Sequence, residues 1–222
     1  MLDPVYPILD RRTCDAANVD PDALVRMWLD LGIKTFQIRD KQNTESDYIE
    51  FARGIKESFP DARLIANDFA RAALNSDQLF TALHLGQEDW SNLPPALKGD
   101  LDAACKRGFK LGLSTHTFQQ FQAAAGLNLA YTAIGPVMAT TSKPGGTDPV
   151  VTAMELEQIF REAARTQRQL VVIGGLGVGN LEKILFRDRL AWFPENLRPV
   201  PAIIQAALRR DEIQAMLDIL KD

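Results

Sequence analysis

In the segment Thr35-Phe36-Gln37-Ile38-Arg39-Asp40-Lys41 (TFQIRDK), an apolar, β-forming run ends abruptly in two cations and a carboxylate. Runs of this kind are typical of strands that are buried on both faces of a parallel sheet. When parallel strands close into a barrel, the loops after their carboxyl ends form the face that carries the catalytic groups. The stretch therefore predicts a buried parallel strand that delivers charged side chains to such a face.

Seven further runs repeat this pattern, and longer segments of helical character separate them. The eight expected strands are Tyr6–Asp10, Thr35–Arg39, Leu64–Asn67, Ala82–Leu85, Lys110–Ser114, Leu129–Gly135, Leu170–Gly174 and Ala202–Ala206. Asp20 before Pro21 has the form of an N-cap, and Thr152 with Glu155 that of a capping box. The alternation predicts an α/β protein, a single-domain (βα)8 TIM barrel over residues 1–222. An open doubly wound sheet is the alternative, but no G-x-G-x-x-G follows the first strand.

The composition is that of an ordinary globular protein, with 46% apolar residues, 24% charged residues and a net charge of −4 over 222 residues. Two cysteines and two histidines argue against a disulfide framework and a structural zinc site. The acidic excess argues against a nucleic-acid partner, and no apolar run approaches the ~20 residues that span a bilayer. Since no secretory signal is evident, we expect a cytoplasmic protein that binds small molecules and neither nucleic acid nor membrane. The oligomeric state stays open.

The second strand carries cations on one face. Gln37, Arg39 and Lys41 share that face because side chains alternate along a strand. Two neighbouring cations repel each other unless an anion lies between them, which favours an anionic ligand. The alternative is that each cation pairs with a local carboxylate. Asp40 is the obvious candidate, although it points to the other face if the strand persists.

Carboxylates follow the next two strands. Asp68 comes directly after the third strand and Asp89 shortly after the fourth. Neighbouring strands lie only ~4.8 Å apart, so the two carboxylates can converge on one point. Mg²⁺ is commonly held by one or two carboxylates together with substrate phosphate oxygens. The pair therefore favours metal-assisted binding of a diphosphate; the alternative is that each residue N-caps the helix that follows.

The loops after the sixth and seventh strands suit a phosphate monoester. Thr140, Thr141 and Ser142 supply three hydroxyls just before Lys143. Gly174-Gly175 allows the backbone to approach a ligand closely, although a plain tight turn also explains two glycines. In barrels of this kind the loops after strands seven and eight often bind phosphate.

Two histidines end strands. His84 is interpreted as a hydrogen-bonded structural residue, and His116 stays a candidate for acid–base chemistry.

Six motifs follow six successive strand ends: QIRDK (37–41), AND (66–68), HLGQED (84–89), LSTHT (113–117), IGPVMATTSKPG (134–145) and IGGLGVGN (173–180). In order and spacing they resemble the thiamine-phosphate synthase family, over about residues 5 to 182. The resemblance implies a (βα)8 barrel and a transferase of thiamine biosynthesis. It would condense 4-amino-2-methyl-5-(diphosphooxymethyl)pyrimidine with thiazole phosphate, giving thiamine phosphate and diphosphate.

The resemblance also implies roles for individual residues. Those implied to hold the pyrimidine diphosphate are Gln37, Arg39, Lys41, Asn67, Ser114 and Lys143. Those implied to hold the thiazole phosphate are Thr140, Thr141, Ser142 and Gly175, with Ile204 and Gln205 through their backbone amides. The metal, Mg²⁺, would be bound by Asp68 and Asp89. The catalytic residues among them would be Arg39, Lys41, Ser114 and Lys143.

The implied reaction is dissociative. Diphosphate leaves first, and the thiazole nitrogen then attacks the pyrimidine-methyl cation. Mg²⁺ and the cations can stabilise the departing negative charge electrostatically. No strong general base is required, which agrees with the scarcity of histidine.

Three departures from the family pattern bear on this expectation. Asp40 stands where Glu is usual, and Ser142 where a second Thr is usual. The segment 200–207 lacks the usual glycine and has Gln205 in place of a serine, after apparently extra residues that contain WFPEN (192–196). Two alternatives stay open: a related thiazole tautomerase with His116 as its acid–base, and a non-catalytic protein that binds thiazole or thiamine phosphate. The residues for a diphosphate and a metal argue against the tautomerase.

Overall fold

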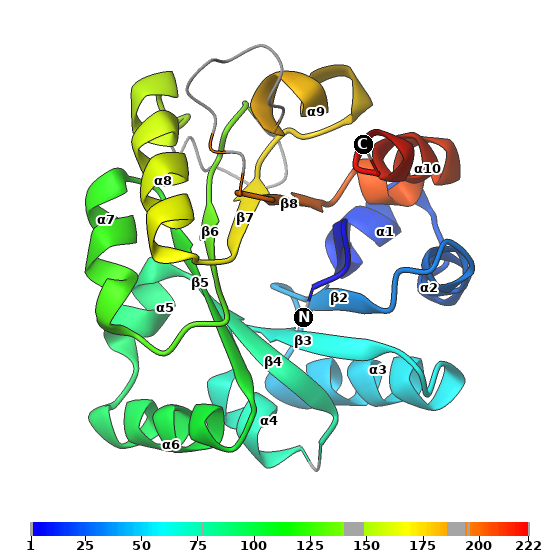
Figure 1. Cartoon of the computed structure of the whole chain (residues 1–222). Coiled ribbons are helices and arrows are strands. Elements are labelled where there is room, and N and C mark those ends of the chain that lie inside the picture. Colours follow the sequence, from blue (N-terminus) through cyan, green and yellow to red (C-terminus); the bar gives the residue numbers. More distant parts are fainter. Residues whose placement is uncertain (1, 77, 140–148, 186–193, 195, 222) are drawn as a thin grey trace.

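A computed structural model describes residues 2–76, 78–139, 149–185, 194 and 196–221. Eight parallel strands close into a barrel in sequence order, which confirms the predicted fold (Figure 1). The strands are β1 (Tyr6–Asp10), β2 (Thr35–Arg39), β3 (Arg63–Asn67), β4 (Phe80–Leu85), β5 (Lys110–Thr115), β6 (Tyr131–Ile134), β7 (Leu170–Ile173) and β8 (Val200–Ile203).

Helices surround the barrel on its outside (Figure 1). The α-helices are α1 (Arg11–Ala17), α2 (Pro21–Asp30), α3 (Glu45–Ser58), α4 (Ala70–Asn75), α5 (Gln87–Asn92), α6 (Pro95–Lys106), α7 (Phe118–Ala123), α8 (Ala153–Thr166), α9 (Val178–Leu185) and α10 (Arg210–Ile219). Two 3₁₀ helices, η1 (Ala124–Gly126) and η3 (Ala206–Leu208), complete the set of described helices. None of the described helices combines the length and the apolar character that crossing a bilayer requires.

The helix starts that the sequence indicates are confirmed. The Asp20 carboxylate accepts hydrogen bonds from two backbone amides in the first turn of α2. At α8, Thr152 and Glu155 form a reciprocal capping box. These contacts satisfy amides that have no partner within a helix, and so they fix where each helix begins.

Two apolar clusters form the core. The larger one lies between the strands and the surrounding helices, and Trp28 of α2 is its largest fully buried side chain. The Trp28 indole N–H donates to the carbonyl of Ala207 at 2.9 Å, and this bond joins α2 to η3. The smaller cluster lines the inside of the barrel and includes Tyr6, Ile65 and Val171. A packed interior of this kind supports the strand ends, where the loops meet.

The eighth strand lies earlier than the sequence predicts. It spans Val200–Ile203 rather than Ala202–Ala206. Gln205 already has helical dihedral angles (φ −64°, ψ −40°), and η3 follows it directly. Two consecutive alanines favour this change, because alanine forms helix more readily than strand. Ile204 and Gln205 therefore follow the strand, as loop residues at its carboxyl end.

The predicted bounds of β1 and β2 are confirmed, and those of β3 to β7 differ at either end by one or two residues. β3, β4 and β5 are slightly longer, and β6 and β7 are shorter. β7 ends at Ile173 because Gly174 has a φ of +104°, which no extended strand residue adopts. Of the WFPEN segment, residues 192, 193 and 195 lie outside the described residues.

Candidate active site

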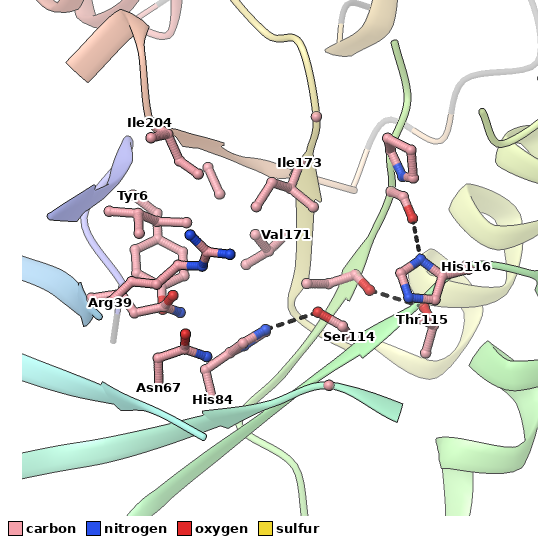
Figure 2. A pocket seen from close by; sticks show the side chains of 18 of the residues that line it. Tyr6, Arg39, Asn67, His84, Ser114, Thr115, His116, Val171, Ile173 and Ile204 are labelled. Atoms are coloured by element: carbon pink, nitrogen blue, oxygen red, sulfur yellow. Dashed lines mark hydrogen bonds between the residues drawn. The ribbon is translucent and has the colours of Figure 1, made fainter. Parts of the chain in front are cut away.

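A cavity of about 800 Å³ opens where the carboxyl ends of the strands meet (Figure 2). Ten of the predicted site residues line it: Gln37, Arg39, Lys41, Asn67, Asp68, Asp89, Ser114, Gly175, Ile204 and Gln205. The other four, Thr140, Thr141, Ser142 and Lys143, lie outside the described residues. Ala139 and Pro149, which flank that segment, line the cavity. The structure thus brings every described site residue to one place.

Arg39 faces the cavity and pairs with Asp10. The two residues are register partners at the ends of β2 and β1, and the Arg39 guanidinium donates to Asp10 Oδ2. The other Asp10 oxygen caps α1 by accepting from the backbone N–H and the hydroxyl of Thr13, at 2.8 and 2.7 Å. Asp10 is buried, so its charge is held against the guanidinium. The alternative that Arg39 pairs with a carboxylate is confirmed, but the partner is Asp10 of the neighbouring strand and not Asp40, which pairs with Arg11.

Lys41 pairs with Asp68 across the ends of β2 and β3. Its ammonium donates to Asp68 Oδ2, while Asp68 Oδ1 accepts from the Asn67 side-chain amide at 2.7 Å. Asp68 has a left-handed backbone (φ +64°), which aspartate tolerates better than most residues do. It makes no capping bond to α4, whose N-cap residue is Phe69, so the alternative of a helix cap is wrong for Asp68.

Asp89 brings a second carboxylate to Asp68. Burial raises the pKa of Asp68, the charge of Lys41 lowers it, and the nearby Asp89 raises it again, with a net shift above the ordinary value. Asp89 is the third residue of α5, whose N-cap is Gly86, so the alternative that Asp89 N-caps this helix is wrong. Its carboxylate nevertheless accepts from the Gly86 backbone N–H at 3.1 Å and so helps to fix the start of α5. Two carboxylates that repel each other beside a single lysine can take up a divalent cation.

Within the described residues, a metal ion at Asp68 and Asp89 would need further ligands. Among the described residues, no group of three or more His, Cys, Asp or Glu side chains is arranged to hold a metal. The donor set of Asp68 and Asp89 is oxygen only, which suits a hard cation that keeps water or takes phosphate oxygens from a substrate. The residues present therefore fit an ion that binds together with an anionic ligand.

A chain of hydrogen bonds crosses the inside of the barrel beneath these charges. Gln37 Nε2 donates to the Tyr6 hydroxyl at 2.9 Å, and this hydroxyl lies 2.9 Å from that of Tyr131. The Tyr131 oxygen is 3.0 Å from His84 Nδ1, and His84 Nε2 is 2.8 Å from Ser114 Oγ (Figure 2). The five side chains come from β1, β2, β4, β5 and β6. They link two predicted site residues, Gln37 and Ser114, through three residues that carry no predicted role in the site.

The protonation state of His84 fixes which group donates and which accepts in each of these hydrogen bonds. Burial lowers the pKa of His84 to about 4, so near neutral pH one ring nitrogen donates and the other accepts. Because the Tyr6 hydroxyl accepts from Gln37, its own hydrogen is free to donate to the Tyr131 hydroxyl, and the Tyr131 hydroxyl donates in turn to His84. His84 then accepts from Tyr131 at Nδ1 and donates from Nε2 to Ser114. The hydroxyl hydrogen of Ser114 is left to point at a ligand in the cavity.

The second histidine also lines the cavity. His116 Nδ1 lies 2.6 Å from the Gly135 carbonyl oxygen, which can only accept, so this nitrogen carries the hydrogen (Figure 2). The His116 backbone N–H donates to the Gln120 side chain at 2.7 Å. The ring is thus fixed by a backbone contact rather than by a carboxylate that would make it a stronger base.

Among the described residues, the charged side chains of the cavity lie on one side of it. In the described part of its wall, all Asp, Glu, Lys and Arg side chains lie at the end of β2 or shortly after β2, β3 and β4; they are Arg39, Lys41, Asp68, Glu88 and Asp89. The opposite side, from β6 to β8, presents backbone and apolar side chains such as Ile173 and Ile204 (Figure 2). The cavity can therefore hold a charged group at one end and an apolar ring at the other.

The two glycines after β7 serve a packing requirement. Gly175 has a φ of +66°, and a Cβ there would lie 2.7 Å from the Ala139 carbonyl oxygen and from Met138 Cβ. The predicted close approach is thus to the loop after β6, and a contact with a ligand stays a prediction. Asn180 of α9 holds this turn by donating to the Gly175 carbonyl at 2.8 Å.

Comparison with known proteins agrees with this geometry. The family model described as thiamine monophosphate synthase matches residues 5–188. The chain belongs to this family. A thiamine-phosphate synthase from Salmonella newport (strain SL254) is 31% identical over 221 residues, which cover 99% of this chain and 97% of that protein. One from Shigella sonnei (strain Ss046) is 29% identical over 222 residues, with the same two coverages.

The fold of a solved relative agrees as well. The thiamine phosphate pyrophosphorylase from Pyrococcus furiosus superposes with a TM-score of 0.73 at 20% identity, covering 98% of this chain and 95% of that one. At this identity the likeness shows the barrel fold alone.

Within this member of the thiamine monophosphate synthase family, sequence reasoning missed three buried polar residues of the cavity region: Asp10, Tyr6 and Tyr131. A signal existed for Asp10, because it ends the first expected strand as Arg39 ends the second. Tyr6 and Tyr131 give no such signal, since an aromatic residue in a strand is more often plain core. Their hydroxyls matter only because they lie on the inside of the barrel, opposite Gln37 and His84.

Proposed function

We propose that this chain joins 4-amino-2-methyl-5-(diphosphooxymethyl)pyrimidine to a thiazole phosphate, forming thiamine phosphate and releasing diphosphate. One observation carries the proposal: cations and carboxylates from three strand ends meet at one mouth of the barrel, namely Arg39, Lys41, Asp68 and Asp89. Membership of the family supports it, and so do the names of relatives that align over nearly their whole length.

The diphosphate group is expected to bind at the ends of β2, β3 and β4. Arg39 and Lys41 would contact its oxygens, and both cations are already directed to this side of the cavity. We assign Asp68 and Asp89 to Mg²⁺, because two carboxylates with phosphate oxygens form a ligand set that this ion commonly takes. When bound, the ion would neutralise negative charge on the departing diphosphate.

Ser114 is expected to act as a hydrogen-bond donor to the diphosphate substrate. Its hydroxyl oxygen accepts from His84, so its own hydrogen is available to the cavity. A donor that is oriented before the reaction stabilises developing negative charge without a reorganisation cost. Gln37 and Asn67, on the same side of the wall, are expected to contact the pyrimidine part.

The proposed bond changes need no general base in the chain. The carbon–oxygen bond to the diphosphate breaks first, and its electron pair leaves with the diphosphate. The lone pair of the thiazole nitrogen then forms the new carbon–nitrogen bond to the pyrimidine-methyl carbon. The apolar wall, including Val171 and Ile173, would keep water from the cationic carbon (Figure 2).

The thiazole phosphate is expected to bind on the side of β6 to β8. Ile204 and Gln205 follow β8 and line the cavity, as does Gly175 after β7. Thr140, Thr141 and Ser142 are assigned to its phosphate and Lys143 to the diphosphate, by resemblance alone, because they lie outside the described residues.

The purified chain tests the proposal directly. Incubation with both substrates and Mg²⁺ is expected to give thiamine phosphate and diphosphate in equal amounts, with no product when EDTA removes the ion. Isomerisation of the thiazole substrate alone would support a tautomerase instead. Saturable binding of both substrates without product would support a non-catalytic binding protein.

A further inference from the structure

Asp40, between the two cations that face the cavity, has a buried side chain outside the cavity wall. This side chain is 1% exposed. Oδ1 accepts from the backbone N–H groups of Gln42 and Asn43 at 3.0 and 3.2 Å. Oδ2 accepts from the Asn43 side-chain amide at 2.7 Å and from Arg11 Nη1 at 3.1 Å. The Asp40 carboxylate therefore fixes the loop that carries Lys41, because it bonds the two residues after Lys41 and is itself held by Arg11.

Arg11 ties this carboxylate to the first helix. It begins α1, directly after Asp10, and its guanidinium also lies over the ring of Phe51 in α3, 4.8 Å from the centroid. The strand ends thus carry reciprocal pairs. Asp10 binds Arg39 near the cavity, and Arg11 binds Asp40 on the outer side.

The charge on Asp40 is well stabilised. Burial alone would raise its pKa, but hydrogen bonds from Asn43 and Gln42, together with the charge of Arg11, hold the pKa below its ordinary value. The carboxylate is therefore ionised throughout the neutral range, and the contacts with Arg11 and the loop persist there.

We propose that Asp40, anchored by Arg11, is a positioning residue that directs Lys41 toward the diphosphate end of the cavity. The identity of the ligand, a diphosphate, rests on the proposed function, whereas the positioning of the loop by Asp40 rests on the hydrogen bonds described above. Lys41 lies between Asp40 and Gln42, so its backbone direction is set by the bonds on either side of it. Its side chain is half exposed and its ammonium is held by Asp68, so the loop sets the backbone position from which Lys41 reaches both Asp68 and the diphosphate end of the cavity.

The consequence is specific to one substrate. A looser loop lets the Lys41 ammonium sample positions away from the diphosphate, which weakens binding of that group. The thiazole end proposed for the cavity lies after β6 to β8, across the barrel from the end of β2 that leads into this loop. A change at Arg11 or Asp40 is therefore expected to affect the two substrates unequally.

The test compares Arg11→Met and Asp40→Asn with two controls. Methionine keeps the apolar stem over Phe51 but loses the charge, and asparagine keeps an acceptor for the loop amides but loses the ion pair. Arg11→Lys retains the charge and is the conservative rescue. Asp47→Asn removes a carboxylate of the same loop region, the exposed one of the α3 capping box, which bonds the Thr44 hydroxyl at 2.7 Å.

Two readouts separate positioning from stability. The first is binding of inorganic diphosphate with Mg²⁺ by calorimetry, together with KM for each substrate. Arg11→Met and Asp40→Asn are expected to weaken diphosphate binding about tenfold, which corresponds to about 1.4 kcal/mol. KM for the pyrimidine diphosphate should rise by the same factor, and KM for the thiazole phosphate should stay constant. The second is hydrogen exchange of the Gln42 and Asn43 amides, which should become faster in the metal-free chain.

The outcomes are decisive. Rescue by Arg11→Lys, with Asp47→Asn lowering Tm but leaving diphosphate binding unchanged, supports positioning. Diphosphate binding that is unchanged in Arg11→Met, or KM values that rise equally for both substrates, would overturn it. A wild-type chain that neither binds diphosphate nor turns over the substrates would overturn the proposed function. In that case faster amide exchange in Arg11→Met would still establish that Arg11 and Asp40 hold the loop.

Discussion

His84 Nε2 lies 2.8 Å from Ser114 Oγ, and this contact ends a chain of polar side chains that crosses the barrel interior (Figure 2). The chain begins at Gln37, so both of its ends are residues of the cavity wall. A fully hydrogen-bonded polar network in a barrel core specifies one arrangement, because any break leaves a buried polar group unpaired. The orientation of Ser114 is thus set by strands on the other side of the barrel.

His84→Gln should lower turnover more than it weakens binding. Glutamine is polar, but it cannot place one atom at Tyr131 and another at Ser114 as the imidazole ring does. We expect kcat to fall about tenfold, and Ser114→Ala to lower it about 100-fold, as for the loss of a preorganised donor. Steady-state kinetics with both substrates and Mg²⁺ checks this expectation.

The control for that experiment is Thr132→Val. Thr132 is buried in β6 next to Tyr131, and within the described part of the chain its hydroxyl has no hydrogen-bond partner. Its removal should leave kcat unchanged. If His84→Gln also left kcat unchanged and only lowered Tm, the hydrogen-bond chain would be a structural feature without a part in catalysis.

The depressed pKa of His84 predicts how stability varies with pH. Burial lowers the pKa from its ordinary 6.5 to about 4 in the folded protein. Between these values the unfolded chain binds a proton that the folded chain does not. The free energy of unfolding therefore falls as the pH falls through this window, by on the order of 3 kcal/mol in all. Above pH 6.5 His84 contributes no pH dependence.

Urea denaturation in EDTA at pH 7.5 and pH 5 measures this contribution. EDTA keeps the comparison free of bound metal. Other titrating groups also contribute to the difference, so the wild type is compared with His84→Gln, which lacks only the titration of His84. The wild type should lose more stability than the variant between the two pH values. Equal losses would mean that His84 takes up a proton in the folded state.

The site residues that could be predicted from the sequence are those that come directly at the end of an apolar strand. Arg39 follows an apolar run on β2 and Asp68 one on β3, so the closed barrel brings them together even though 28 residues separate them. The same reasoning locates Ser114 at the end of β5. These residues are found because a polar side chain directly after a buried strand has few structural explanations in a parallel barrel.

The partner of Arg39 and the position of the eighth strand could not be predicted, because they depend on contacts between elements and not on the hydrophobic pattern along the sequence. Nothing in the local sequence of Arg39 distinguishes Asp10 from Asp40 as its partner, and only the register of β1 against β2 decides it. The eighth strand is misplaced for a related reason. Its apolar run continues from Val200 into the alanines of η3, and the place where strand becomes helix is fixed by packing, including the bond from Trp28 to Ala207.

Asp89→Asn tests the metal assignment. The asparagine side-chain oxygen can still accept from the Gly86 N–H, so the start of α5 and the fold should persist. One negative charge is lost from the pair with Asp68, and the Mg²⁺ concentration needed for half-maximal rate should rise at least about tenfold. Glu88→Gln, a neighbouring residue on the same wall, should shift it little. Equal Mg²⁺ requirements for Asp89→Asn and the wild type would contradict the assignment.

Gly175→Ala and Gly179→Ala should have opposite effects on the chain. A Cβ at Gly175 would meet the Ala139 carbonyl at 2.7 Å, and the φ of +66° adds strain, so the loops after β6 and β7 must separate. Tm should fall, and KM for the thiazole phosphate should rise while KM for the pyrimidine diphosphate stays constant. Gly179 lies inside α9 with nothing within 4 Å of the added Cβ, so alanine there should stabilise the chain by about 0.5–1 kcal/mol. Thermal unfolding and steady-state kinetics of the two variants measure both effects. A rise in KM for the pyrimidine diphosphate in Gly175→Ala would place the thiazole phosphate elsewhere in the cavity.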